Sequence, residues 1–166
     1  MPVPADIRPL IVEDAAACDA VVASLPYHFG NEDGRRLCAE AVRSQDGLVA
    51  VERDPAAGEG DVVGFLTFER HFEASAEITW MAVRADRRHG GVGTALLDEV
   101  CARLEAEGRT LLLAFTVSPS EPDDEVDGYD ATRAFYRSRG FETAREVPEL
   151  WPDDPAILLV RVLGGA

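Results

Sequence analysis

The 166-residue sequence contains no lysine; all 16 of its basic residues are arginine. Without a lysine amine, no side chain can form a Schiff base with a carbonyl compound, and the lysine-dependent phosphate loop of nucleotide hydrolases is excluded. Acidic residues number 31, which gives a formal net charge of −15. Because nucleic-acid binding requires a basic face, we expect no nucleic-acid partner. The acidic excess either attracts cationic partners or only keeps the protein in solution.

Cysteine is also scarce, and Cys18, Cys38 and Cys101 lie far apart with no Cys-x-x-Cys pair. This spacing supports neither a metal site nor a disulfide framework, so we expect small buried or half-buried thiols and no metal. The sequence contains no run of about 18 apolar residues, the length needed to span a membrane. Its first residues also lack the basic-then-apolar pattern of a secretory signal. We therefore expect a cytoplasmic protein with no membrane partner. The length suggests one domain over residues 1–166.

Hydrophobic patterning, in contrast, is regular and predicts a mixed α/β domain with an antiparallel meander in its first half and a β-α-β crossover in its second. Periods of two and of 3.6 residues, together with glycine and proline breaks, define the elements. We expect strands at residues 7–12, 47–54, 62–72, 77–83, 110–117, 141–146 and 155–163, and helices at 13–25, from Asn31 or Asp33 to about 43, at 92–107 and at 131–139.

Two of these elements carry specific predictions about which side chains share a face. In the strand EITWMAV, strict alternation groups Ile78, Trp80 and Ala82 on one face and Glu77, Thr79, Met81 and Val83 on the other. In the helix ATRAFYRSR, we expect Ala131, Ala134 and Phe135 to point inward.

The segment RADRRHGGVGT, residues 84–94, concentrates positive charge and bare backbone ahead of a helix. The free N–H groups and the dipole of a helix N-terminus favour anions, phosphates in particular. Arg84, Arg87, Arg88 and His89 would add local positive potential, and Gly91 and Gly93 would let a ligand approach the backbone. The alternative is a tight turn with solvated arginines. The dinucleotide pattern G-x-G-x-x-G is absent, so a coenzyme A site is the phosphate-binding interpretation that remains.

The segment from Arg88 to Gly93 matches the pattern Arg/Gln-x-x-Gly-x-Gly/Ala and resembles the central motif of the GCN5-related N-acetyltransferase (GNAT) family. A second segment, ATRAFYRSRGFE, is similar to that family's later motif, a short helix with Phe-Tyr followed by Gly-Phe at the next strand. The resemblance covers residues 47–163. It implies the GNAT fold, an α/β fold in which a mixed, mostly antiparallel central sheet is flanked by about four helices.

The same resemblance implies acetyl-CoA as co-substrate and assigns residues to its binding. The pantetheine arm would pair with the backbone of Met81, Ala82 and Val83. The pyrophosphate would lie on the amides of the segment that begins the helix, with Arg88 beside it; this segment comprises His89, Gly90, Gly91, Val92, Gly93 and Thr94.

For catalysis, the resemblance assigns the general acid that protonates the departing thiolate to Tyr136, which could instead be a helix-edge tyrosine. The base would be Glu77, directly or through a water. His71, Glu69 and Glu73 are weaker alternatives, and Glu77 could also be a solvated residue at the start of a strand. Many family members have an asparagine seven residues before the tyrosine; Tyr129 stands there in this chain, so that contact is in doubt.

The acceptor is less defined: a primary amine on a small molecule or a protein. Tyr27 and Phe29 lie between the first two helices, and Trp151 lies between the last two strands; each could line an acceptor pocket or fill a hydrophobic core. The acidic loop 120–130 could border that pocket or be solvated. Family members often form homodimers. Two other functions stay open: a CoA-binding module without turnover and a nucleotide-binding regulator.

Overall fold

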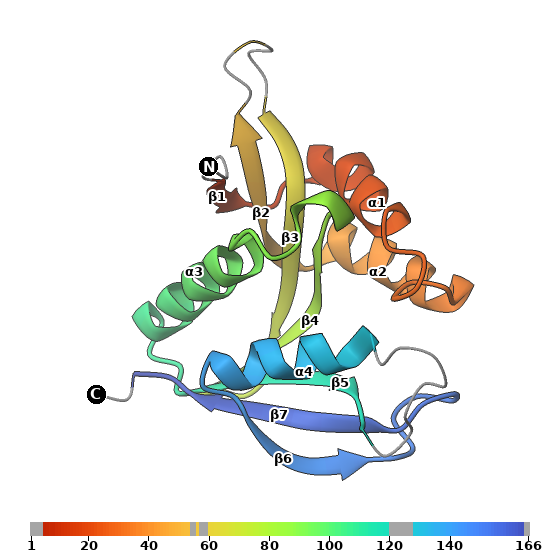
Figure 1. Ribbon diagram of the computed structural model, residues 1–166. Helices are drawn as coiled ribbons and strands as arrows, with labels where there is room; N and C mark the ends of the chain where they lie inside the picture. The colour runs from red at the N-terminus through yellow and green to blue at the C-terminus, as the bar shows by residue number, and fades with distance from the viewer. Residues whose placement is uncertain (1–4, 54–55, 57–59, 120–127, 165–166) are drawn as a thin grey trace. The chain divides into compact units, whose positions relative to one another are not determined.

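The computed structural model describes residues 5–53, 56, 60–119 and 128–164, which are coloured in Figure 1. This part of the chain forms strands and helices in the predicted order. They are β1 (Asp6–Pro9), η1 (Val12–Asp14), α1 (Ala15–Ala23), α2 (Glu32–Ser44), β2 (Asp46–Arg53), β3 (Gly60–Arg70), β4 (Ser75–Val83), η2 (Ala85–Arg87), α3 (Val92–Ala106), β5 (Leu111–Val117), α4 (Gly128–Ser138), β6 (Glu142–Val147) and β7 (Ala156–Val162).

The strands follow the order β1-β2-β3-β4-β5-β7-β6. The pairs β1–β2, β2–β3, β5–β7 and β6–β7 are antiparallel, whereas β4 and β5 run parallel and are joined through α3. The predicted meander and the β-α-β crossover are therefore confirmed, as is a mixed, mostly antiparallel sheet. Among the helices within the described ranges, none is long and apolar enough to cross a membrane.

The chain divides into two compact units, each of which is described by itself. Unit 1 comprises residues Met1–Glu69 and Thr79–Arg103, and unit 2 comprises Arg70–Ile78 and Leu104–Ala166. Strand β4 contributes to both, because the division falls between Ile78 and Thr79. The prediction of a single domain stays a prediction.

In unit 1, helices α1 and α2 pack on one face of β2 and β3. Cys18 and Val21 of α1 and Cys38 of α2 form a buried cluster with Val49 and Phe65 of the two strands. Burial raises the pKa of Cys18 and of Cys38 to about 12, and all three cysteines are buried. The pKa values rise because an apolar environment disfavours the thiolate. The expectation of buried thiols is confirmed.

Helix α3 covers the opposite face of β3. A Cβ placed on Gly64, the neighbour of Phe65 along β3, would meet Val92 Cγ1 at 3.0 Å and Leu96 Cδ1 at 3.4 Å. Successive side chains of a strand point to opposite faces, so α3 lies on the side away from α1 and α2, as Figure 1 shows. The absent side chain at Gly64 lets the beginning of α3 pack close to the sheet.

In unit 2, helix α4 packs on β5 and carries a different inward face from the predicted one. Ala131 and Ala134 are exposed, whereas Arg133 and Tyr136 are buried. The side chain of Arg133 donates to the carbonyl oxygen of Val117, the last residue of β5 (2.8 Å). The prediction of an alanine face was wrong, because the buried guanidinium finds its partner on the strand and turns that side of the helix inward.

Candidate functional site

The turn between β4 and α3 is fixed to unit 1 by two hydrogen bonds at its start. The amide of Arg84 donates to the carbonyl of Val63 in β3 (2.8 Å), and the amide of Ala85 donates to Ser24 Oγ, at the end of α1 (3.2 Å). Within the turn, the amide of Arg87 donates to the carbonyl of Arg84 (2.8 Å), which closes the short helix η2. The chain therefore leaves β4 in a defined direction before it reaches the glycines.

Helix α3 begins with unused backbone donors. Its first helical hydrogen bond runs from the amide of Ala95 to the carbonyl of Gly91 (3.0 Å), so the amides of Val92, Gly93 and Thr94 precede the helical ladder. No backbone acceptor for these three amides occurs in the part of the chain that the structure describes. At the end of a 15-residue helix, such donors and the helix dipole create a region that favours an anion.

Two residues just before α3 have left-handed backbone conformations. Gly91 has φ +88°, and a Cβ there would meet no atom within 4 Å. His89 has φ +64° and is the one non-glycine residue with positive φ among the described residues. A side chain at Gly91 would therefore be opposed by backbone strain rather than by a clash with the protein.

The positive charge of this turn is smaller than its sequence indicates. Arg84 Nε donates to Asp86 (2.6 Å), and Arg87 Nε donates to both carboxylate oxygens of Glu52 on β2 (2.8 and 3.0 Å). Arg87 Nη1 also contacts Asp86 (2.9 Å). Arg88 has no ion pair with any residue that the structure describes. Two acidic residues thus balance two of the predicted cations, and Arg88 supplies most of the remaining charge.

Strand β4 breaks the predicted alternation at Thr79. The hydroxyl of Thr79 donates to Gln45, the residue that follows α2, while the ring of Trp80 packs against Phe29 between α1 and α2, with 5.9 Å between ring centroids. Two consecutive side chains therefore point to the α1–α2 side, and the prediction that Thr79 faces away from Trp80 was wrong. Such an irregularity is typical of a β-bulge. The alternation that grouped Glu77 with Met81 and Val83 does not hold through it.

The coenzyme-binding residues predicted on this strand lie in unit 1. Ala82 is buried in the core with α1 and α2, and Met81 and Val83 are half-buried. The prediction concerned the backbone groups of these three residues, and it stays a prediction.

In unit 2, the structure brings together two of the candidate bases. His71 Nε2 lies 2.9 Å from Glu77 Oε1, across the turn between β3 and β4, and both side chains are partly exposed. The turn is rigidly held, since Arg109 Nη1 donates to the carbonyls of Phe72 (2.9 Å) and Ser75 (3.0 Å). A carboxylate that shares a hydrogen bond with an imidazole is a plausible proton acceptor by its chemistry.

The other candidate bases have different surroundings. Glu73 is exposed on the same turn, and Glu69, in unit 1, accepts a hydrogen bond from Gln45 Nε2 (3.1 Å).

Tyr136, the predicted general acid, lies in an aromatic cluster of unit 2. Its ring meets Phe141 edge-on at 5.1 Å between centroids and Phe135 at 5.5 Å, and only 5% of the residue is exposed. Burial raises the pKa of the phenol, so the hydroxyl stays protonated at neutral pH. Such a group can donate a proton but cannot serve as a base.

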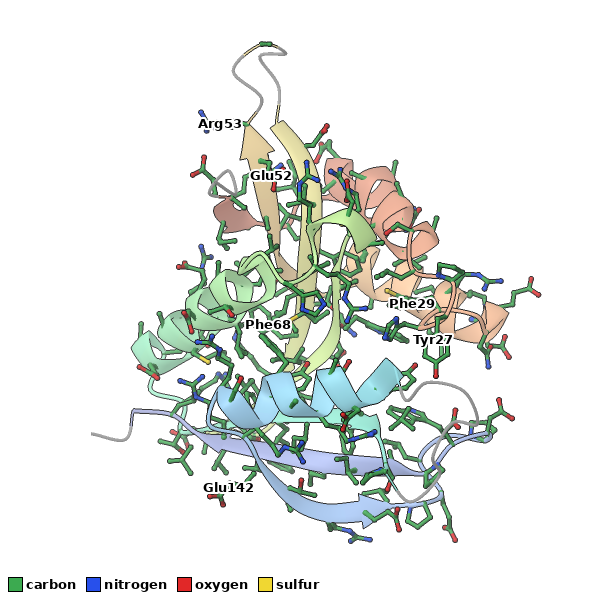
Figure 2. The ribbon with its side chains drawn as sticks, viewed as in Figure 1. Tyr27, Phe29, Glu52, Arg53, Phe68 and Glu142 are labelled. Atoms are coloured by element: carbon green, nitrogen blue, oxygen red, sulfur yellow. The ribbon has the colours of Figure 1, made fainter. Side chains whose placement is uncertain are left out.

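The aromatic residues predicted for the acceptor differ in exposure (Figure 2). Phe29 is buried in the α1–α2 core, which agrees with the interpretation as a hydrophobic plug. Tyr27 is half exposed and stands edge-on to His28. Trp151, on the connection between β6 and β7 of unit 2, is 36% exposed. Tyr129 lies in the first turn of α4, and residues 120–127 of the acidic loop lie outside the described residues.

Sequence reasoning missed Glu52 and Ser24. They lie 35 and 61 residues from the groups they contact, so no local pattern could indicate them. Within the described ranges, no three His, Cys, Asp or Glu side chains gather in a way that could hold a metal ion.

Comparisons with known proteins identify the family and the fold of this chain. Residues 44–143 match the profile of the acetyltransferase (GNAT) domain. No match was found among curated proteins. Among solved structures, a GNAT-family structure from Desulfovibrio desulfuricans aligns with TM-score 0.77 and 24% identity over 95% of this chain and 98% of its own. The ribosomal-protein-S18-alanine N-acetyltransferase from Escherichia coli aligns with TM-score 0.70 and 19% identity over 98% and 96%. An aminoglycoside 6'-N-acetyltransferase complexed with coenzyme A aligns with TM-score 0.71 and 16% identity over 97% and 98%.

Proposed function

Since the chain belongs to the GNAT family of acetyltransferases, we propose that it transfers an acetyl group from acetyl-CoA directly to a primary amine. The observation that supports this most is the beginning of α3. There, the amides of Val92, Gly93 and Thr94 precede the helical ladder, and Arg88, four residues before Val92, has no ion pair with a described residue. This set of donors fits a diphosphate.

In this proposal, the diphosphate of the coenzyme binds to the amides from His89 to Thr94, and Arg88 contributes its guanidinium. The open space above Gly91 accommodates the phosphate oxygens at the backbone. The pantetheine arm lies along the backbone of β4 from Met81 to Val83. The coenzyme supplies an acetyl group activated as a thioester.

The protein's own groups then manage two protons. An ammonium has no lone pair, so the acceptor must first lose a proton to Glu77, directly or through a water, with His71 hydrogen-bonded to the carboxylate. The amine nitrogen forms a bond to the carbonyl carbon as the carbon–sulfur bond breaks, and the new amide nitrogen then gives its second proton to water. Tyr136, kept protonated by burial, donates its proton to the departing sulfur.

The acceptor is a primary amine on a small molecule or a protein. The net charge of −15 favours a cationic one by long-range attraction. Tyr27 and Trp151, which keep substantial exposure, are the better candidates for contact with it; Phe29 shapes the site from the core. The enzyme would act in the cytoplasm, as a monomer or a homodimer.

Thermal shift measurements with CoA, acetyl-CoA, ATP and NAD test the coenzyme. We expect stabilisation by the first two only. Stabilisation by ATP or NAD, without a response to CoA, would favour a nucleotide-binding regulator instead.

Release of the CoA thiol with a panel of primary amines tests the reaction. We expect at least one amine to raise thiol release above hydrolysis. One observation favours a second candidate, a CoA-binding module without turnover. The aromatic cluster provides an alternative, structural reason for a tyrosine at position 136. Tight binding of CoA with no turnover on any amine would support that candidate.

A further inference from the structure

We infer that Glu52, on β2, is a positioning residue for coenzyme binding. It acts through Arg87, and it does so in two ways: it fixes the end of the turn that precedes α3, and it leaves Arg88 as the arginine that meets the diphosphate. This inference rests on the proposed function.

The contact is a two-oxygen ion pair in a partly shielded position. Arg87 Nε donates to both oxygens of Glu52, at 2.8 and 3.0 Å, and the Glu52 side chain is only 13% exposed. Figure 2 labels Glu52 near the end of β2. Hydrogen bonding to Glu52, with the nearby carboxylates of Asp86 and Asp61, raises the pKa of the Arg87 guanidinium. The carboxylate is shielded although the Arg87 side chain is 39% exposed, so this pair orders its partners more firmly than a fully exposed pair does.

The position of Arg87 in the turn explains why this pair matters. The backbone anchors, Arg84 to Val63 and Ala85 to Ser24, hold only the start of the turn. Arg87 ends η2, and the next hydrogen bond along the backbone is that of Ala95 to Gly91. The Glu52–Arg87 pair is thus the last side-chain attachment before the segment whose amides would bind the phosphates.

The pair also separates the roles of two adjacent arginines. A guanidinium that already binds a carboxylate through Nε is oriented by that carboxylate, whereas Arg88 is paired with no described residue. Without Glu52, Arg87 would compete with Arg88 for the same anion, and the turn would lose its fixed end. The structure therefore assigns Glu52 to positioning and Arg88 to direct contact.

Calorimetric titration with CoA tests this assignment in four variants: Glu52→Gln, Arg87→Gln, the double variant, and Arg53→Gln. Arg53 is the matched control, because it follows Glu52 on the same strand and makes an exposed ion pair with Asp6. We expect Glu52→Gln to weaken CoA binding about 10-fold, as loss of one partner of a shielded pair costs more than loss of a surface pair. Arg87→Gln should have a similar effect, the double variant should be no worse than either single change, and Arg53→Gln should bind as the wild type does.

Amide hydrogen exchange of the free protein supplies a measurement that does not depend on the coenzyme. In Glu52→Gln and Arg87→Gln, peptides covering residues 84–91 should exchange faster, while peptides from α2 should not change. Arg88→Gln should weaken CoA binding and its salt dependence without altering exchange, since it removes a direct contact.

The inference would be overturned if the Glu52→Gln variant bound CoA as well as the wild type does, or better. It would also be overturned if the losses of CoA binding from the two single changes added up in the double variant. If Glu52→Gln does not fold, Arg87→Gln gives the same decision from the other partner. A wild type that fails to bind CoA would remove the proposed function, and this inference with it. Normal binding by the wild type with an unaffected Glu52→Gln variant would remove the inference alone.

Discussion

The turn before α3 and the helix α4 carry the two family motifs, and they work by different means. The turn offers backbone: amides, glycines and a left-handed conformation at Gly91. Helix α4 offers side chains, with Tyr136 and Arg133 buried against their unit. A site made from backbone depends on conformation, which a glycine pattern indicates directly. A site made from side chains depends on which face of the helix is buried, and that is decided by partners elsewhere in the chain.

The largest effect should come from Gly91→Glu, which tests the backbone site. We expect CoA binding to fall below detection in calorimetry, because the new side chain must accept φ +88° and brings a negative charge to the position of the diphosphate. Gly108→Glu is the matched control: Gly108 has φ +83° and equally open space, but lies beyond the end of α3. It should lose stability and keep CoA binding. Equal CoA binding by both variants would contradict a site at Gly91.

Tyr136→Phe tests the side-chain site and should have the next largest effect. We expect kcat to fall by about 100- to 10,000-fold, as loss of a general acid allows, with nearly normal binding of acetyl-CoA. Phe141→Leu is the control, since it disturbs the same aromatic cluster and keeps the hydroxyl. If Phe141→Leu lowers kcat as much as Tyr136→Phe does, packing rather than the hydroxyl explains the loss.

Glu107→Gln tests the ion pairs that Glu107 makes with Arg70 and Arg109. Hydrogen bonds from Arg70 and then Arg109 lower the pKa of Glu107 to about 2. A carboxyl whose pKa is lowered by folding stabilises the protein above its unfolded pKa of about 4.5, and this contribution is lost as pH falls toward 2. We expect Glu107→Gln to lower Tm by a few degrees at pH 7. The difference from the wild type should shrink between pH 4.5 and pH 2. A difference that stays constant over this range would contradict the role of the ion pair.

The smallest effect should come from His89→Gly. The residue has φ +64°, a conformation that costs a residue with a side chain about 1–2 kcal/mol and that glycine adopts without this cost. The greater freedom of glycine in the unfolded chain offsets about half of the stability gained by relieving that strain. We expect unfolding free energy to rise by about 0.5–1 kcal/mol, measured by urea denaturation. CoA binding should change little, because the proposal uses the amide of this residue. A loss of stability would indicate that the imidazole makes a contact of its own.

Much of the fold could be predicted from the sequence. The helix predicted at 92–107 occurs at Val92–Ala106, and the strand predicted at 110–117 occurs at Leu111–Val117. The periodic spacing of apolar residues and the glycines at the ends decide these elements locally. The site was less predictable. The break in alternation at Thr79 accompanies a hydrogen bond to Gln45, which follows α2, and the pairing of Arg87 follows from a carboxylate on β2.

The same reasoning explains the wrong prediction on α4. Small apolar residues at 131 and 134 favoured an inward alanine face, and only the position of Val117 shows why Arg133 is buried instead. A buried arginine is rare without a partner, so sequence alone gives no reason to expect one. The glycine segment, in contrast, occupies the place that its pattern predicted.

The burial of all three cysteines has a practical consequence for every kinetic experiment proposed above. Thiol-reactive reporters such as disulfide dyes respond to thiolates that solvent can reach. Cys18 and Cys38 have pKa values of about 12 in the folded protein, and Cys101 is only 3% exposed. The folded protein should therefore contribute almost no background colour. Released CoA can then be followed continuously, and a slow rise in colour without substrate becomes a direct record of unfolding.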